Sequence, residues 1–531
     1  MKKVNLLTMS MLSIGFFISV SKCDAATFIV DTTTDTSLSA CDAVNANDCS
    51  LRGALNAANA TPAADDIVFN IPQSDAGFQA ATQHWRITVP DGALLPSLVA
   101  PVVIDGSTQP SAIANSNTPA QGGLNGALKI EIRGSNPAGN ANFAFQLLGD
   151  SPSVLRGLVI SGYRDAQVFL SGQGAHRIEG CYLGTDITGN SAALLNGTQP
   201  LTNGIIFAGN GDYVIGGIAP GERNLLSGLN FAMSTSGNAL ASVRIQGNLV
   251  GTNAAGTAVV GNTFGLLSFR FGDTLIGGTD ANARNVFSGH TGQAMLFRTA
   301  GNAGVFANTQ VLGNYFGTDV SGTRALGNDF QRSGSTIEIS AIGCALTLGG
   351  TAAGEANLIA YSASSGVAVF GCNGQQTPLN RYLGNQGPAF DNGVGNGTFG
   401  STPNDPLDVD EGGNRLQNFP ELTLPPLGST LLGYRVDTAV ANATYPITVN
   451  FYRAGCGGGS DALVTSAMIS AVQAQQALSL DTAGLDSYLP LTATAVDAAG
   501  NTSEFAPTLG EAIFASGFED QTAPGTVGSC R

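Results

Sequence analysis

Short runs of four to six residues with alternating β-branched side chains fill the middle of the chain, each bounded by glycine or asparagine. Leu158-Val-Ile-Ser161, Thr336-Ile-Glu-Ile-Ser340 and Gly366-Val-Ala-Val-Phe370 are typical examples. Alternation with a period of two predicts strands, and the bounding residues predict tight corners between them. Because no helical periodicity extends over eleven residues in this region, we expect an all-β fold.

A motif with a period of about 66 residues runs through the same region. Gly180-Cys-Tyr-Leu-Gly-Thr-Asp186 recurs as Gly247-Asn-Leu-Val-Gly-Thr-Asn253, as Gly313-Asn-Tyr-Phe-Gly-Thr-Asp319 and, in decayed form, as Arg381-Tyr-Leu-Gly-Asn385. A fixed period of this length indicates a solenoid of stacked repeats. Divided by three, 66 residues give coils of 22, with room for three short strands and three turns in each.

A second element follows each of the first three copies of the motif. It reads Ile215-Gly-Gly217 with Arg223-Asn224, Ile276-Gly-Gly278 with Arg284-Asn285, and Leu348-Gly-Gly350 with Ala356-Asn357. Together with Asn248 and Asn314, these asparagines are expected to be stacked corner residues, in the left-handed conformation that such turns demand.

The two ends of the chain have other patterns. Cys49-Ser-Leu-Arg-Gly-Ala-Leu-Asn-Ala-Ala-Asn59 predicts a helix with one apolar stripe, which would cover the first coil. If Ser50 is its N-cap, Gly53 stands where a glutamate would complete a capping box, and the helix is weakened by roughly 1 kcal/mol. After Pro420, alternating strands separated by glycine and proline turns predict a small β-sandwich.

Several of these segments resemble known proteins. Ile104-Asp-Gly-Ser-Thr-Gln-Pro110, the repeated elements, and Asn404-Asp-Pro-Leu-Asp408 with Leu416-Gln-Asn-Phe-Pro420 resemble secreted bacterial proteins with right-handed parallel β-helix repeats. The helical segment is similar to the CSLREA domain that opens many such proteins, apart from Gly53. The resemblance covers about residues 27 to 510 and implies a pectin-lyase-like β-helix. Asp497-Ala-Ala-Gly-Asn-Thr-Ser-Glu-Phe505 resembles the last hairpin of immunoglobulin-like modules.

The predicted organisation therefore has five parts. Residues 1–25 form a signal peptide, 26–100 a cap with the first coils, 101–420 the β-helix, 421–510 an immunoglobulin-like sandwich and 511–531 a C-terminal tail. The prediction of export rests on Lys2 and Lys3, which are followed by an apolar run and by small residues at Ala25 and Ala26. The tail contains Ile513-Phe-Ala-Ser-Gly-Phe-Glu519, which resembles a terminal motif of exported Gram-negative proteins.

Composition narrows the classes of function. The 71 glycines and the charged fraction of 11% are typical of neither a helical nor a disordered protein. With a net charge of −16 and one lysine, Lys129, beyond residue 25, the chain has no basic patch for nucleic acid. The three histidines are not paired at the spacing typical of metal ligands, which argues against a zinc site. An acidic surface suits Ca²⁺, but no D-x-D-x-D-G loop occurs, so no cofactor is expected.

Cysteines of an exported protein are expected to pair. The close pairs Cys41 with Cys49 and Cys344 with Cys372 are predicted disulfides, and Cys456 with Cys530 follows only by elimination. Cys181 is left as a buried structural thiol.

Candidates for chemistry are weak. Asp165 and Asp186 are one predicted coil apart, near Arg164, and a like-charged pair could supply an acid. The recurrence of Asp186 as Asn253 favours a turn-capping role instead. Arg223 and Arg284 could bind anionic sugars, although a stacking or corner role is favoured. Trp85 could be a sugar platform, although a lone tryptophan more often lies in a core.

Two classes of function remain. The first is an extracellular or cell-surface β-helix protein, non-catalytic and adhesin-like, that contacts polysaccharides or cell-surface glycans. The second is a polysaccharide lyase or glycoside hydrolase, which rests on analogy of fold. Neither a nucleic acid partner nor a transmembrane segment in the mature chain is expected, and the oligomeric state stays open.

Overall fold

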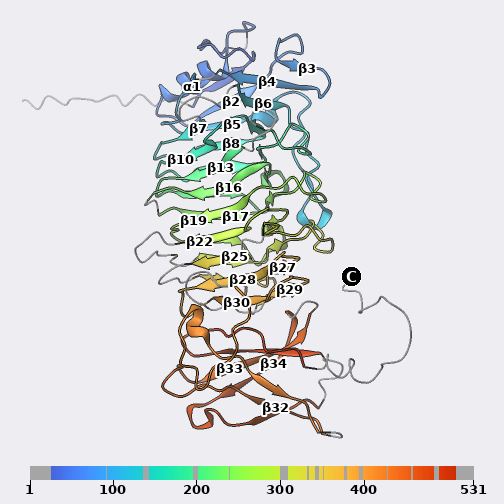
Figure 1. The fold of residues 1–531 in the computed structure, drawn as a ribbon. Coiled ribbons are helices and arrows are strands. Elements are labelled where there is room, and N and C mark those ends of the chain that lie inside the picture. Colours follow the sequence, from blue (N-terminus) through green and yellow to red (C-terminus); the bar gives the residue numbers. More distant parts are fainter. Residues whose placement is uncertain are drawn as a thin grey trace, which may run out of the picture.

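Three long parallel sheets make up most of the molecule, which is nearly all β (Figure 1). The computed structural model describes residues 25–509, apart from 43, 91, 136–142, 195–200, 238–239, 299–305, 307–308, 332–333, 341–345, 351, 376–379, 394–398, 427–428, 456–458 and 484–489. The predicted signal peptide, except Ala25, and the C-terminal tail lie outside the described residues.

The three sheets are named here by number. Sheet 1 has ten strands, in the spatial order β1 (Thr27–Val30), β2 (Asp65–Phe69), β5 (Val102–Asp105), β8 (Val154–Arg156), β11 (Arg177–Glu179), β14 (Asp212–Gly216), β17 (Ser242–Gln246), β20 (Thr274–Gly277), β23 (Thr309–Leu312) and β26 (Thr347–Leu348). Sheet 2 has eleven, β3 (Phe78–Gln79), β4 (His84–Val89), β6 (Ile130–Gly134), β9 (Leu158–Ser161), β12 (Tyr182–Leu183), β15 (Leu225–Leu226), β18 (Leu249–Val250), β21 (Val286–Phe287), β24 (Tyr315–Phe316), β27 (Leu358–Ala360) and β29 (Arg381–Leu383). Sheet 3 has nine, β7 (Phe143–Leu147), β10 (Ala166–Leu170), β13 (Leu201–Phe207), β16 (Leu229–Thr235), β19 (Phe264–Ser268), β22 (Met295–Arg298), β25 (Ser335–Ser340), β28 (Ser365–Phe370) and β30 (Phe390–Gly393).

From β5 to β28, successive strands go to sheet 1, sheet 2 and sheet 3 in turn, and then the cycle begins again one layer lower (Figure 1). Apart from the β3–β4 hairpin, the pairs within these sheets are parallel. This order agrees with the predicted β-helix or solenoid.

The interior is filled by apolar residues that repeat at the same register position. In sheet 1 the inward position of successive strands is fully buried and is occupied by Ile67, Ile104, Leu155, Ile178, Ile215, Ile245, Ile276, Val311 and Leu348. Parallel strands lie about 4.8 Å apart, so these side chains stack in contact and exclude water along the axis.

Each 66-residue repeat spans two coils, and the predicted three coils are wrong. Tyr182 pairs with Leu225, and Leu225 pairs with Leu249, which is the position of Tyr182 in the next repeat. Part of the length expected for the third coil is taken up by a turn that leaves the stack after every second strand of sheet 2, closed by the bridge between Thr185 and Ala192 and its equivalents. These residues of the repeat therefore form a turn outside the stack and not a coil.

The acids of the Gly-Thr-Asp motif cap these turns, as the turn-capping interpretation predicts. Asp186 Oδ1 accepts hydrogen bonds from the Thr188 amide at 3.1 Å and the Asn190 amide at 3.2 Å. Asn253 accepts two backbone N–H groups in the same way. The next residue in each turn packs on the outer face of sheet 2, where it joins a cluster that includes Tyr182, Leu225, Leu249, Ala254, Val286 and Val320.

The corner asparagines form one continuous ladder, which confirms the prediction that they stack. Each side-chain N–H donates to the Oδ1 of the asparagine one coil further on, over 2.9 to 3.1 Å, through Asn224, Asn248, Asn285, Asn314, Asn357 and Asn380. The left-handed conformation predicted for them is wrong, because none of these asparagines has a positive φ. Before Asn248 and Asn314 that conformation belongs to a glycine, with φ of 72° at Gly247 and 67° at Gly313. Cys181 is buried with a free thiol and takes the ladder position above Asn224, whose Oδ1 accepts its N–H.

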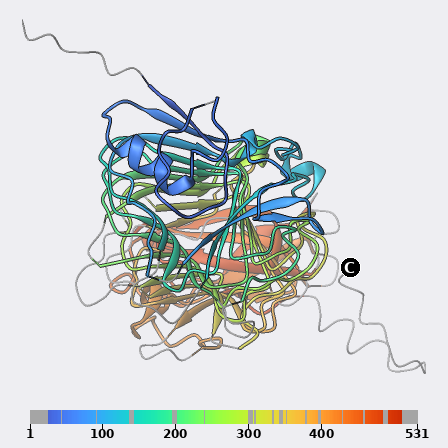
Figure 2. The same cartoon turned by 90° about the horizontal axis from the view of Figure 1, so that it is seen from above.

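The predicted N-terminal helix is α1 (Leu51–Asn59), which lies over the first coils in the view along the axis (Figure 2). Ser50 is its N-cap and accepts the Gly53 N–H at 3.0 Å. A β-carbon at Gly53 would lie 1.6 Å from the carbonyl oxygen of Leu38. The glycine that weakens the helix is therefore required by the chain packed against it.

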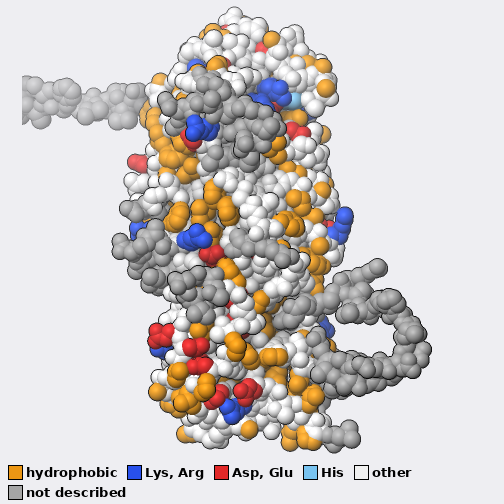
Figure 3. Space-filling view, in the orientation of Figure 1, with side chains coloured by type: hydrophobic (Ala, Val, Ile, Leu, Met, Phe, Trp, Pro, Cys, Tyr) orange, Lys and Arg blue, Asp and Glu red, His pale blue; other side chains and the backbone are white. Residues whose placement is uncertain are grey.

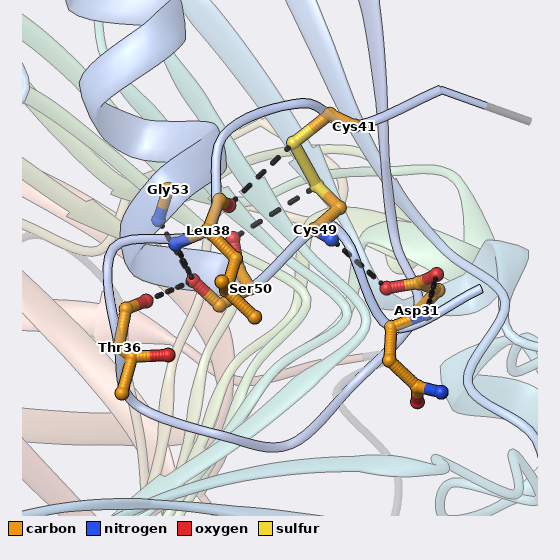
Figure 4. The surroundings of a disulfide bond; sticks show 8 residues. Asp31, Thr36, Leu38, Cys41, Cys49, Ser50 and Gly53 are labelled. Atoms are coloured by element: carbon orange, nitrogen blue, oxygen red, sulfur yellow. Dashed lines mark hydrogen bonds between the residues drawn. A yellow bond between two sulfur atoms is a disulfide. The ribbon is translucent and has the colours of Figure 1, made fainter. Parts of the chain in front are cut away.

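A disulfide between Cys41 and Cys49 closes the loop before this helix, as predicted (Figure 4). Asp31 accepts the Cys49 N–H at 3.1 Å and so ties the loop to the end of β1. Cys372 is also disulfide-bonded. Cys344, Cys456 and Cys530 lie outside the described residues, so their pairings stay predictions.

Two antiparallel three-stranded sheets follow the stack (Figure 1). Their orders are β31 (Glu421–Thr423), β32 (Leu431–Arg435), β35 (Leu478–Asp481) and β34 (Ser460–Ile469), β33 (Ile447–Ala454), β36 (Leu491–Val496). One apolar cluster joins them, with Leu432 and Tyr434 from the first sheet and Val449 and Ala493 from the second.

The ladder makes a stability prediction. Replacing Asn285 by Ala leaves the buried Ile245 carbonyl without its 2.7 Å donor and interrupts the ladder on both sides. We expect the free energy of unfolding to fall by about 1–3 kcal/mol, measured by denaturant titration. Asn190→Ala, at an exposed turn position, is the matched control with a change below about 0.5 kcal/mol; equal effects of both would contradict the ladder's role.

Candidate functional site

A groove of about 480 Å³ lies on the outer face of sheet 1, over β11, β14, β17 and β20. Its polar lining comes from Arg177, Asp212, Ser242, Arg244 and Asp273. Alternation explains their position: Tyr213, Val243 and Ile245 have the opposite parity and are buried, so Asp212, Ser242 and Arg244 face outward.

The two arginines of the groove are held differently. Arg177 donates to Glu179 through Nε and to Glu222 Oε1 at 3.3 Å through Nη2, and Arg156 joins the same network at 2.9 Å from Glu179. Arg244 is exposed and forms no side-chain interaction with the described residues. One guanidinium is thus fixed by carboxylates, while the other has its donors available to a ligand.

The two acids of the groove stand at the same register position on different strands of sheet 1, that is, in one column of the sheet. Asp212 pairs with Ser242, and Val243 pairs with Thr274, so that Asp273 stands two strands below Asp212. Two strand spacings put their backbones about 9.6 Å apart. Both side chains are exposed and line the same groove. The groove therefore offers acceptors and donors together, which suits a polyhydroxylated ligand.

Asp165 and Asp186 lie at the same corner of the stack, between sheets 2 and 3. Val159 of β9 pairs with Tyr182 of β12, and each acid follows its strand, Asp165 with Arg164 before β10 and Asp186 in its turn. The Asp186 carboxylate is occupied as a turn cap. Asp165 accepts a hydrogen bond from Asn203 through its backbone carbonyl at 2.8 Å. Neither acid lines the groove on sheet 1.

Arg223 lies inside the protein, 1% exposed. Its guanidinium donates to the carbonyls of Gly247 at 3.0 Å, Asn117 at 2.8 Å and Gly122 at 3.1 Å. Burial lowers the pKa of Arg223 to about 10. These contacts hold the loop before β6 against the coil, which argues against a contact with a sugar.

Arg284 and Trp85 also make internal contacts. Arg284 stacks 4.2 Å over the Tyr315 ring and donates to the Gly313 carbonyl at 3.3 Å. Trp85 is 4% exposed, and its indole N–H donates to the Pro72 carbonyl at 2.9 Å. Its buried ring packs against Phe78, so no face is open as a sugar platform.

The neighbours of Trp85 surround a buried carboxylate. Glu131 accepts His84 Nε2 at 3.0 Å and Arg86 Nε at 2.6 Å, and lies 3.4 Å from Arg133 Nη1. Burial alone would raise the pKa of Glu131, but the hydrogen bonds from His84 and Arg86 and the charges of both arginines lower it to about 2. Glu131 therefore stays ionised at all ordinary pH values, and its carboxylate links the β3–β4 hairpin to β6.

Three acids beyond the stack could hold a hard cation. Carboxylate oxygens of Asp405, Asp408 and Asp410 lie within 4.8 Å of one another, and oxygen is the ligand that Ca²⁺ prefers. Asp408 is already hydrogen-bonded by the Asn418 amide and the Thr438 hydroxyl, each at 2.9 Å. Burial raises the pKa of Asp408 to about 7. The spacing differs from a D-x-D-x-D-G loop, and sequence analysis missed this cluster.

No helix among the described residues is long and apolar enough to span a membrane. The sequence matches no family model and no curated protein.

The groove residues were also missed from the sequence. Arg177, Asp212, Arg244 and Asp273 belong to no repeated motif, and each lies in a strand of sheet 1 or directly before one. Their signal was the register: with the strands of sheet 1 aligned on their isoleucines, the charged residues fall in two adjacent outward columns. The predicted three-coil repeat misaligned those strands.

The placement of Arg223 gives a test of its role. Replacing it by Ala leaves three carbonyl groups without their donor, and we expect the free energy of unfolding to fall by about 2–4 kcal/mol. Arg244→Ala, on the exposed groove surface, should change it by less than about 0.5 kcal/mol. Chemical denaturation of both variants measures the difference; an unchanged midpoint for Arg223→Ala would contradict a structural role.

Proposed function

We propose that this is an exported extracellular or cell-surface protein that binds polysaccharide or cell-surface glycan without catalysis. The stack is a right-handed, pectin-lyase-like parallel β-helix opened by a CSLREA-like cap, and the two antiparallel sheets after it form an immunoglobulin-like sandwich. The signal-peptide pattern of residues 1–25 supports export. The net charge of −16 argues against nucleic acid as a partner.

The groove on sheet 1 is the observation that carries the glycan proposal. It is a depression of about 480 Å³ with a mixed polar and apolar lining on a long, regular face, in the size range of ligand sites. Arg244 supplies donors, and Asp212 and Asp273 supply acceptors, as hydroxyl groups of a sugar chain require. The direction of the stack allows a chain ligand to continue over neighbouring coils.

A hydrolytic function is the second candidate, favoured by the spacing of Asp212 and Asp273. Inverting glycosidases place two carboxyl groups about 6.5–9.5 Å apart, which leaves room for a water molecule. The backbone separation of about 9.6 Å lies just above the range given for the carboxyl groups themselves. In this candidate one acid protonates the leaving oxygen and the other activates the water.

Binding through the groove is tested with Arg244. Purified mature protein is titrated with a panel of acidic and neutral polysaccharides in a calorimeter, and Arg244→Ala should weaken binding about tenfold or more, because a hydrogen bond to a charged group is lost. Arg324→Ala, an exposed arginine on a turn outside the groove, should bind as the wild type does. Absence of binding by the wild type across the panel would refute the proposal.

Catalysis is tested by following new reducing ends and ultraviolet-absorbing unsaturated products with the same panel. For the hydrolytic candidate, Asp212→Asn and Asp273→Asn should each lower turnover by at least 100-fold, whereas Asp186→Asn should keep it. Binding without turnover in the wild type supports the non-catalytic function and removes the hydrolytic one. Unsaturated products would instead indicate a lyase.

A further inference from the structure

The lower end of the stack is closed by the segment that follows β36. Thr502 accepts Asn392 Nδ2 at 2.8 Å and Asn414 Nδ2 at 3.2 Å through its carbonyl, and Gly374 donates its N–H to Asn501 Oδ1 at 2.7 Å. Phe505 packs against Tyr382 of the last coil with a ring separation of 5.5 Å. These contacts attach the antiparallel sheets to the stack at β30.

Two carboxyl groups from opposite sides of this junction are buried in it. Glu504 is 4% exposed and accepts the backbone N–H groups of Asn392 and Thr402, each at 3.0 Å. Asp391, the neighbour of Asn392 in β30, is fully buried. Its Oδ2 accepts the Ser365 hydroxyl at 2.9 Å, while Oδ1 is buried and has no partner among the described residues.

No cation compensates this pair within the described part of the chain. The charge that acts on Glu504 is that of Asp391, which has the same sign. Tyr382 and Tyr452, which pack against Phe505, stay neutral because burial raises the pKa of both, to about 12 for Tyr452. Two buried carboxylates without a cation repel each other strongly at low dielectric.

We propose that this junction is a proton-controlled clasp, in which protonation of the Asp391 and Glu504 pair holds the C-terminal sheets on the last coil and loss of protons loosens them. The clasp is independent of the glycan groove, which lies several coils away on sheet 1.

The direction of the effect follows from linkage. Burial, with the Asp391 charge added, raises the pKa of Glu504 to about 8, whereas a glutamate exposed by opening has a pKa of about 4.3. Between these values the closed junction binds one proton more than the open one. Closure is therefore strongest below about pH 4.3 and weakens about tenfold per pH unit as the pH rises toward 8. Burial also raises the pKa of Asp391, which acts in the same direction.

Hydrogen exchange of the full chain between pH 5 and 9 tests the clasp. After correction for the intrinsic pH dependence of exchange, the opening constant of peptides covering 390–393 and 501–509 should rise about tenfold per pH unit up to about pH 8. Peptides from the middle coils, such as 242–250, should show no such slope. Absence of the slope at the junction of the wild type overturns the proposal.

Two variants assign the effect to the pair. Glu504→Gln should abolish the slope to within about threefold over the whole range, while Glu411→Gln, at an exposed glutamate outside the junction, should keep it. If Glu504→Gln does not fold, Asp391→Asn serves instead: removing the like charge lowers the pKa of Glu504, so the loosening should end at a lower pH. An unaltered pH profile in the variant that folds overturns the proposal.

Discussion

The structure depends on how the buried corners of the stack satisfy their backbone groups. At each corner between sheets 1 and 2 the chain turns inside the protein, where an unpaired N–H or carbonyl would cost about 1–3 kcal/mol. An asparagine supplies both a donor and an acceptor, so a stack of them bonds to the corners above and below as well as to one another. Asn248, for example, accepts the Asn224 N–H and donates to the Ile215 carbonyl. This arrangement works only when coils stack with the corners directly aligned.

Alignment of the corners then decides what each face of the sheets can do. Inward positions coincide from coil to coil, so isoleucine packs on isoleucine and water is excluded from the interior of the stack. Outward positions coincide as well, but whether they are covered or exposed to solvent differs between the sheets. The Gly-Thr-Asp turns fold over sheet 2 and bury Tyr182 and Leu249. No equivalent turn covers Arg244 on sheet 1, so charged side chains there stay exposed and can meet a ligand. On the face seen in Figure 3, charged side chains are sparse along the described stack.

Features that recur, or that rest on local chemistry, could be predicted from the sequence. The strands, the stacked asparagines, helix α1, and the disulfide between Cys41 and Cys49 belong to this group. The number of coils per repeat could not be predicted, because the period gives only the number of residues in each repeat. A turn that leaves the stack uses residues just as a coil does. The groove and the buried Glu504 could not be predicted either, because both depend on which strands become neighbours. Gly53 shows the same limit: its contact with Leu38 lies outside the helix that the pattern describes.

The ends of a stack of parallel strands present unpaired edges, and this chain covers its two ends by different means. At the first coil, α1 is held by the bidentate pair of Arg52 with Asp35 and by a disulfide in the preceding loop. At the last coil, β30 meets a segment more than a hundred residues away in sequence, through amide side chains and two buried carboxyl groups. The first end is thus closed by links that are local in sequence, one of them covalent. The second is closed by contacts with residues that follow the antiparallel sheets, and in the proposed clasp its carboxyl groups make that closure depend on the protons of the surrounding solution.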